Sequence, residues 1–167
     1  MFEIGEYVVY GNKGVCEIKK IGPIDIPGMS NERQYYTLMQ VCSRGSTIFT
    51  PVDNEKSALR RVLSKSEAQD LIDEIHTIKP VWIQNDKERE QIFNEALREA
   101  NTRSLFEMMV ALYQRRERRI ADGKKATSTD ERYFHAAEEI VYGELGVSLG
   151  LNKEDVKACI MKEVEKA

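Results

Sequence analysis

A segment in the carboxy-terminal half of the chain contains six basic side chains that could bind phosphate. They lie between positions 111 and 125, among two acidic residues, and are Arg115, Arg116, Arg118, Arg119, Lys124 and Lys125. This segment has a net charge of +4, whereas residues 126–167 have a net charge of −4. Such a contrast would orient the protein on a phosphate backbone without any reading of base sequence. Cations at a helix end also complement the helix dipole or face water, so this interpretation stays open.

A helical wheel divides the arginines of this basic cluster into two pairs. Arg115 and Arg118 point away from the apolar stripe of their predicted helix, whereas Arg116 and Arg119 fall nearer to it. We therefore expect Arg115 and Arg118 to be the better candidates for phosphate contact.

The only tryptophan, Trp82, lies between the two parts of the chain described below. An indole is a flat apolar wedge, and such side chains can insert at a base step of the minor groove and partly unstack it. A lone tryptophan at a domain junction can equally pack between the domains. Both interpretations follow from the residue and its position.

Residues for catalysis or metal binding are sparse. The chain has two histidines and three cysteines, namely His76, His135, Cys16, Cys42 and Cys159. Neither histidine belongs to a metal-ligand motif, and the three cysteines are far apart. Three late glycines, Gly143, Gly146 and Gly150, fit a helix C-terminus better than a phosphate-binding loop. We therefore predict a protein that is not an enzyme and needs no cofactor or metal.

The length and composition of the chain limit the classes of protein to which it could belong. At 167 residues the chain can form one compact domain or two small ones. No run approaches the ~20 apolar residues of a membrane span, and the start does not read as a secretion signal, so we expect no membrane contact and a cytoplasmic location with reduced thiols. The net charge of −3 argues against a protein that coats nucleic acid by bulk attraction, although a local patch can bind.

The spacing of the apolar residues changes once along the chain, from a pattern typical of strands to one typical of helices. Short runs rich in β-branched and aromatic residues predict strands at 7–10, 15–21, 34–41, 46–50 and 59–62, the last as an edge strand. From Ser64 onward the period is helical, and the spacing of Ser64 to Glu67 fits a capping box.

Residues 83–167 contain four helical patterns, each with one apolar stripe, and therefore predict a compact helical domain. Ser128 with Glu131 fits a capping box at the third pattern, and Asn152 is the expected cap of the fourth. The predicted fold class is α+β, with a small SH3/Tudor-like β barrel and a terminal helix over 1–75, a linker over 76–82, and an all-helical domain over 83–167.

The first hairpin carries a family resemblance. Residues 5–16 read Gly-Glu-Tyr-Val-Val-Tyr-Gly-Asn-Lys-Gly-Val-Cys. This resembles the opening of the CarD/CdnL family of bacterial transcription regulators, Gly-Asp-x-Val-Val-Tyr-Pro-x-His-Gly-Val-Gly, although the Pro, the His and the last Gly are replaced. The family shares this module with transcription-repair coupling factors. The barrel followed by helices is also the family layout, so the resemblance spans nearly the whole chain.

The resemblance implies partners and site residues. The barrel would bind the β subunit of RNA polymerase through its fourth strand, at Thr47, Ile48, Phe49 and Thr50. Some family members have an arginine where Phe49 stands, so the contact here would be more apolar. The helical domain would contact promoter DNA in the minor groove at the upstream edge of the transcription bubble, largely without sequence preference. Its candidate residues are Trp82, Lys87, Arg89, Arg115 and Arg118. Many members place basic residues directly after the tryptophan, whereas here residues 83–86 intervene.

The expected activity is that of a regulator which stabilises the open promoter complex. A ligand that binds the open complex better than the closed one shifts the population toward open. Two other classes remain. The chain could be a protein–protein adaptor on RNA polymerase without direct DNA contact, which an absent DNA footprint would favour. It could also be an unrecognised enzyme, which a cluster of perturbed carboxylates or a metal site would favour.

Overall fold

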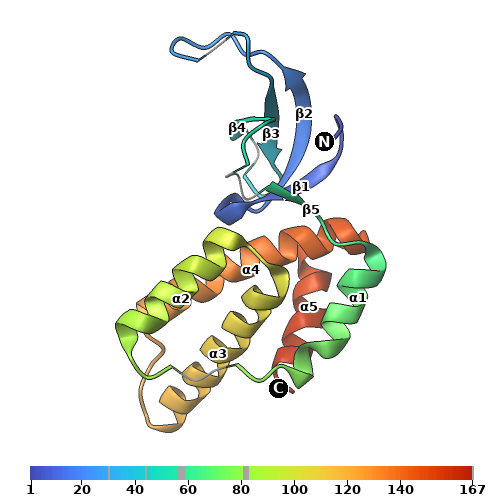
Figure 1. The fold of residues 1–167 in the computed structure, drawn as a ribbon. Helices are drawn as coiled ribbons and strands as arrows, with labels where there is room; N and C mark the ends of the chain where they lie inside the picture. Colours follow the sequence, from blue (N-terminus) through green and yellow to red (C-terminus); the bar gives the residue numbers. More distant parts are fainter. Residues whose placement is uncertain (30, 44, 56–58, 81–82, 167) are drawn as a thin grey trace.

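The computed structural model describes residues 1–29, 31–43, 45–55, 59–80 and 83–166. An antiparallel sheet comes first, and a group of helices follows it (Figure 1). The five strands are β1 (Tyr7–Tyr10), β2 (Val15–Gly22), β3 (Tyr35–Gln40), β4 (Thr47–Pro51) and β5 (Leu59–Arg61). The five α-helices are α1 (Lys65–Glu74), α2 (Asp86–Glu99), α3 (Thr102–Ala121), α4 (Ser128–Leu149) and α5 (Lys153–Val164). This order confirms the predicted α+β fold class.

The strand order in the sheet is β4-β3-β2-β1-β5, so the fourth and fifth strands form the two edges. A short 3-10 turn, η1 (Gly11–Lys13), joins β1 to β2. Gly14 follows this turn with a φ of 74°, a left-handed conformation that other residues adopt at a cost. The turn chemistry predicted from the sequence therefore forms the first hairpin.

The two faces of the sheet bury different groups of side chains. One face forms the small core of the sheet itself, from Val8, Cys16, Ile18, Tyr36 and Leu38. Val9 and Val15, on the opposite face of β1 and β2, belong instead to the large core formed by the helices. Residues that alternate along a strand point to opposite faces, so one hairpin contributes to both cores.

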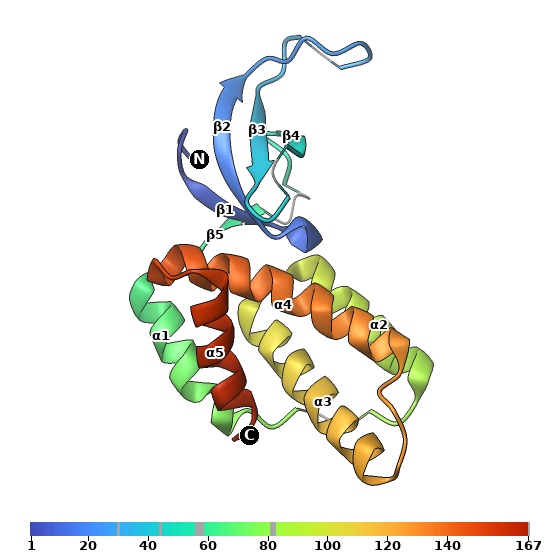
Figure 2. The same ribbon diagram turned by 180° about the vertical axis from the view of Figure 1, so that it is seen from behind.

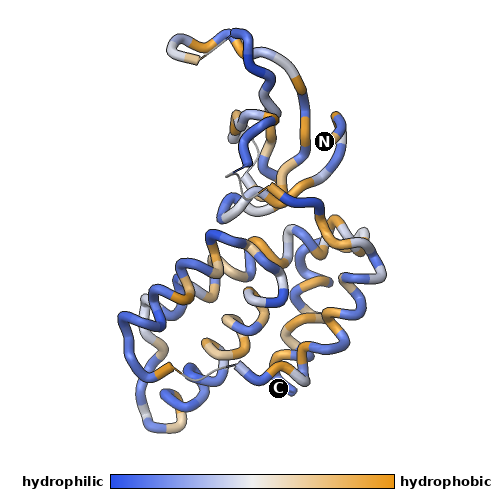
Figure 3. Tube along the Cα trace, in the orientation of Figure 1, coloured by the Kyte–Doolittle hydropathy of each residue, from blue (hydrophilic) through white to orange (hydrophobic). Residues whose placement is uncertain are grey.

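The helices have one buried face each. Hydrophobic and hydrophilic stretches alternate along them (Figure 3), as expected for amphipathic helices packed on one another. The apolar residues that repeat with helical spacing along α3 and α5 are buried, namely Leu105, Met108, Met109, Leu112, Val156, Ile160 and Val164. In α2, by contrast, Ile92 is 40 % exposed.

Helix α1 contributes to the same core. It packs against α4 and α5, and Ala68, Ile72 and the following Ile75 are buried with the other helices. Ile78 is buried there as well. The helical core thus contains residues of α1, of the proposed linker at 76–82 and of α2 to α5.

The helix starts follow local hydrogen bonding. Ser64 accepts from the Glu67 amide and the Glu67 carboxylate accepts from the Ser64 amide, which confirms the capping box. Asn152 caps α5 as expected. The predicted pairing of Ser128 with Glu131 is wrong, because Thr127 caps α4 by accepting from the Asp130 amide.

The three late glycines differ in their roles. Only Gly150 is a C-cap, with a φ of 67°, so the capping explanation is wrong for Gly143 and Gly146, which lie inside α4. A Cβ at Gly143 would lie 3.4 Å from Cys42 Sγ and 3.7 Å from Val15 Cγ2. These are ordinary van der Waals distances, so α4 lies directly against the sheet at this glycine. None of the helices in the described ranges has the length and apolar character needed to cross a membrane.

Candidate functional site

The first candidate surface is the outer edge of β4. Within the described residues β4 pairs only with β3, in a register that places Ile48 opposite Leu38 and Phe49 opposite Thr37. The opposite edge of β4 therefore offers main-chain donors and acceptors that another strand could use.

The side chains of β4 are not equivalent. Ile48 packs on the core of the sheet, and Thr50 is only 1 % exposed. Thr47 is exposed, and Phe49 is half-buried. Because side chains alternate along a strand, Thr47 and Phe49 lie on the face away from that core. Of the four predicted polymerase-binding residues, these two are placed to meet a partner through their side chains.

The second candidate surface lies at the end of the helical region away from the sheet. Helix α3 begins beside the sheet and runs away from it, so that Arg118 lies about 24 Å along the axis from Thr102. The next helix, α4, starts at that far end, and both views show the connection there (Figures 1 and 2). We call this region the distal end, formed by the last turns of α3, residues 122–127 and the start of α2.

Two arginines of the basic cluster hold the distal end together. Arg115 Nε lies 2.6 Å from Asp130 Oδ2, and the two side chains are only 21 % and 9 % exposed. Arg119 Nε donates to the Lys125 carbonyl at 2.8 Å. Arg116 and Arg118 are exposed. The wheel placed Arg115 toward solvent because it considered one helix alone, whereas the start of α4 supplies a carboxylate that the sequence of α3 cannot reveal.

The start of α2 provides the other predicted cations. Lys87 is exposed, whereas Arg89 is only 9 % exposed and pairs with Asp86 at 3.0 Å. Helices α2 and α3 run in opposite directions from a short corner, so the start of α2 and the end of α3 both lie away from that corner (Figure 1). The structure thus brings Lys87 and the basic cluster to one end of the helices. Trp82 lies outside the described residues.

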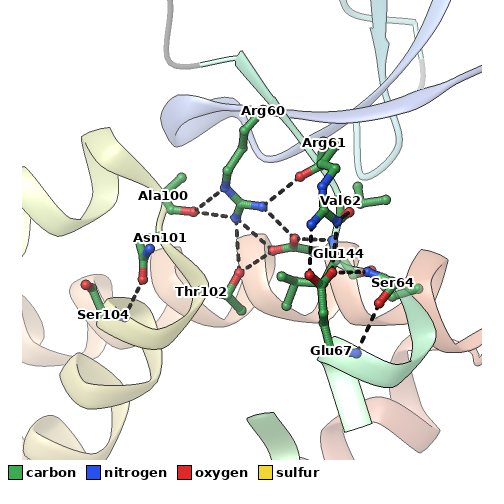
Figure 4. A network of polar contacts seen from close by, with 12 residues as sticks. Arg60, Arg61, Val62, Ser64, Glu67, Ala100, Asn101, Thr102, Ser104 and Glu144 are labelled. Atoms are coloured by element: carbon green, nitrogen blue, oxygen red, sulfur yellow. Dashed lines mark hydrogen bonds and ion pairs between the residues drawn. The ribbon is translucent and has the colours of Figure 1, made fainter. Parts of the chain in front are cut away.

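A third feature, missed by sequence reasoning, joins the sheet to the helices (Figure 4). The Arg60 guanidinium of β5 forms two contacts with the Glu144 carboxylate of α4, Nη1 to Oε1 at 2.7 Å and Nη2 to Oε2 at 2.9 Å. Its Nε and Nη2 both donate to the Ala100 carbonyl, and Nη2 also donates to Thr102 Oγ1 at 3.1 Å. We call these residues the Arg60 network.

Glu144 lies at the centre of the Arg60 network. Its side chain is 0 % exposed, against 28 % for Arg60. It also accepts from the Leu63 amide at 3.0 Å and the Thr102 hydroxyl at 2.7 Å. A carboxylate so fully buried requires this set of donors. The signal in the sequence was a lone acid within the buried stripe of α4, between Val141 and Leu145.

The pKa values of Glu67, beside the Arg60 network, and of Cys16, in the core of the sheet, are shifted. Hydrogen bonds from Arg61, and then from the Ser64 amide, lower the pKa of Glu67 to about 2. Burial raises the pKa of the Cys16 thiol to about 11, and Cys42 adds to the effect. A raised pKa makes Cys16 a poor nucleophile near neutral pH. Among the described residues, no three histidine, cysteine or acidic side chains are grouped to hold a metal ion.

Comparison with known families identifies the amino-terminal part. Residues 2–63 match the family model described as the CarD-like/TRCF RID domain. The match covers all five strands and ends just before the cap of α1. A search of curated proteins finds no match to the chain.

Proposed function

Because residues 2–63 form a Tudor-like CarD-like/TRCF RID domain, a module with an RNA polymerase-interacting role in transcription, we propose that the chain regulates transcription initiation by stabilising the open promoter complex. The CarD-like family is a family of non-enzymatic transcription factors. The observation that carries the proposal is this match, combined with an edge strand, β4, that is free to pair within the described residues.

The polymerase contact is assigned to residues 1–75 and to the β subunit. Strand addition at β4 would use the main chain of residues 47–50, with specificity from the outward side chains Thr47 and Phe49. The sheet edge lies away from the helices (Figure 1), which leaves the distal end available for a second contact.

The DNA contact is assigned to residues 83–167 and the preceding Trp82. Lys87 and Arg118 are proposed as the phosphate contacts because both are exposed, whereas Arg89 is buried and the Arg115 side chain is only 21 % exposed. With few phosphate contacts the isolated protein gains little from counterion release, so its DNA affinity should be weak. A polymerase-bound sheet raises the effective concentration of the distal end at the promoter.

In the proposed mechanism the protein shifts the population of promoter complexes from closed to open. A wedge at the upstream bubble edge meets a distorted minor groove only after the promoter has melted. The protein would therefore bind the open complex more tightly than the closed one, and its effect cannot exceed that difference in affinity. The contact should depend little on base identity, because the minor groove encodes little sequence.

A second candidate function is a protein–protein adaptor on RNA polymerase. The intramolecular engagement of Arg115 and Arg119 favours it, since fewer cations of the cluster remain for phosphate. Footprinting of promoter complexes with the full chain separates the two functions. We expect protection at the upstream bubble edge that weakens in Lys87→Glu/Arg118→Glu, but not in the control Arg98→Glu, which changes a cation at the other end of α2. Polymerase binding without protection would establish the adaptor.

A further inference from the structure

We propose that Arg60 is a positioning residue, which fixes the direction of the helices relative to the polymerase-binding sheet so that the distal end reaches promoter DNA. This inference rests on the proposed function. Arg60 belongs to the edge strand β5, and its guanidinium contacts the corner between α2 and α3 as well as α4 (Figure 4). One side chain of the sheet therefore contacts the end of α2, the start of α3 and the interior of α4.

The geometry of the guanidinium explains why this contact can set a direction. A planar guanidinium with several fixed donors restricts the orientation of its partners, which the point charge of a lysine does not. In the Arg60 network those donors go to a carboxylate on α4, to the carbonyl of Ala100 at the end of α2 and to the hydroxyl of Thr102 at the start of α3. Rotation of the sheet against the helices would break all of these contacts together.

The backbone at the helix corner supports the same conclusion. Ala100 has a φ of 52°, and no other non-glycine residue in the described part of the chain has a positive φ. Such a conformation is disfavoured for alanine and persists when its surroundings fix it. Here the Ala100 carbonyl accepts from two nitrogens of Arg60. The corner from which α3 departs is therefore held in place by a residue of the sheet.

Apolar side chains also pack between the sheet and the helices. The turn η1 packs against α2 and α4, and Val9 and Val15 of the first hairpin lie in the helical core. This packing holds the sheet and helices together, while the directional polar contacts come from Arg60. Loss of the network should therefore loosen the angle between the two parts without separating them.

Arg118 is far from the contact between the sheet and the helices, so a small change in the angle between these two parts moves it by several ångströms. Arg118 lies about 24 Å from the start of α3 by helix geometry, so a tilt of about 10° at the joint moves it by about 4 Å. A displacement of this size exceeds hydrogen-bond length and would remove a phosphate contact. Polymerase binding at β4, on the other edge of the sheet, would be unaffected.

The test uses the full chain with RNA polymerase and one promoter. The variant Arg60→Met/Glu144→Gln removes the ion pair without leaving a buried charge, and the glutamine can still accept from the Leu63 amide. The matched control is Arg61→Met/Glu67→Gln, on the same strand, whose ion pair is exposed and whose glutamine preserves the capping box. Thermal unfolding first establishes that both variants are folded at the assay temperature.

Two quantities are then compared, the affinity for polymerase and the half-life of the open complex. We expect the Arg60→Met/Glu144→Gln variant to bind polymerase like the unmodified chain, and to lose about tenfold in the half-life of the open complex as the effective concentration at DNA falls. The control should match the unmodified chain in both. An equal half-life for the folded network variant would overturn the inference. If the unmodified chain itself fails to lengthen the half-life, the proposed function fails instead.

A cross-link distinguishes positioning from a general loss of stability. Cys42, in the bend after β3, has its Sγ 3.4 Å from the site of a Cβ at residue 143, so Gly143→Cys places a second thiol close to it for oxidation to a disulfide between this bend and α4. With Cys159→Ser to remove the other exposed thiol, oxidation by oxidised glutathione should restore the half-life in the network variant. Reduction should abolish the rescue. Failure of the formed cross-link to restore the half-life, in a folded variant, would contradict a positioning role.

Discussion

Removal of the Glu144 carboxylate should destabilise the whole molecule. Glu144→Ala deletes the acceptor for Arg60, the Leu63 amide and the Thr102 hydroxyl, in a position that is 0 % exposed. Breaking a buried pair by removing one partner costs about 3–5 kcal/mol. Arg60 is 28 % exposed and keeps the Ala100 carbonyl, so we expect the lower end, about 3 kcal/mol.

This cost corresponds to a fall in Tm of about 6–12 °C for a chain of this size. Urea unfolding followed by circular dichroism measures it, with Arg60→Met and the double variant Arg60→Met/Glu144→Ala completing a mutant cycle. Because both residues belong to one network, the double variant should lose less stability than the sum of the two single variants. A loss below about 1 kcal/mol, or strict additivity, would refute the description of Glu144 as the centre of the network.

Three further results are expected. Phe49→Asp should weaken binding to the polymerase β subunit in a pull-down with the full chain, because it places a charge at the proposed edge; unchanged binding would exclude that surface. In an NMR titration the pKa of Glu67, which is lowered to about 2, should rise toward 4.5 in Arg61→Met. Because the folded state lowers this pKa, the contact stabilises the fold at pH values above about 4.5, and this stabilisation is lost as the pH falls toward 2. At about pH 8 an alkylating reagent should label exposed Cys159 and spare buried Cys16 until unfolding; equal labelling would contradict the burial of Cys16.

Local patterns predicted the elements well. The five strands and the capping box at Ser64 depend on residues close in sequence, and the structure confirms them. The shift of the α4 cap from Ser128 to Thr127 is a difference of one residue between two similar hydroxyl side chains. Such boundaries depend on where the preceding loop arrives.

Contacts between distant segments could not be predicted in the same way. Arg60 and Glu144 lie 84 positions apart, and neither has a partner nearby in sequence that would reveal the pair. Gly143 suggested a helix end, whereas it lies inside α4, where the helix packs on Val15 and Cys42. Arg115 was assigned to solvent because Asp130 belongs to another helix. In each case tertiary packing decides the role.

The half-life of the open promoter complex in the presence of saturating protein tests the proposed function most directly. With polymerase and one promoter, the full chain should lengthen this half-life, and Trp82→Ala should shorten it again while polymerase binding is retained. Thermal unfolding of the same variant provides the control for packing. An unmodified chain that binds polymerase yet leaves the half-life unchanged would contradict the proposed stabilisation of the open complex.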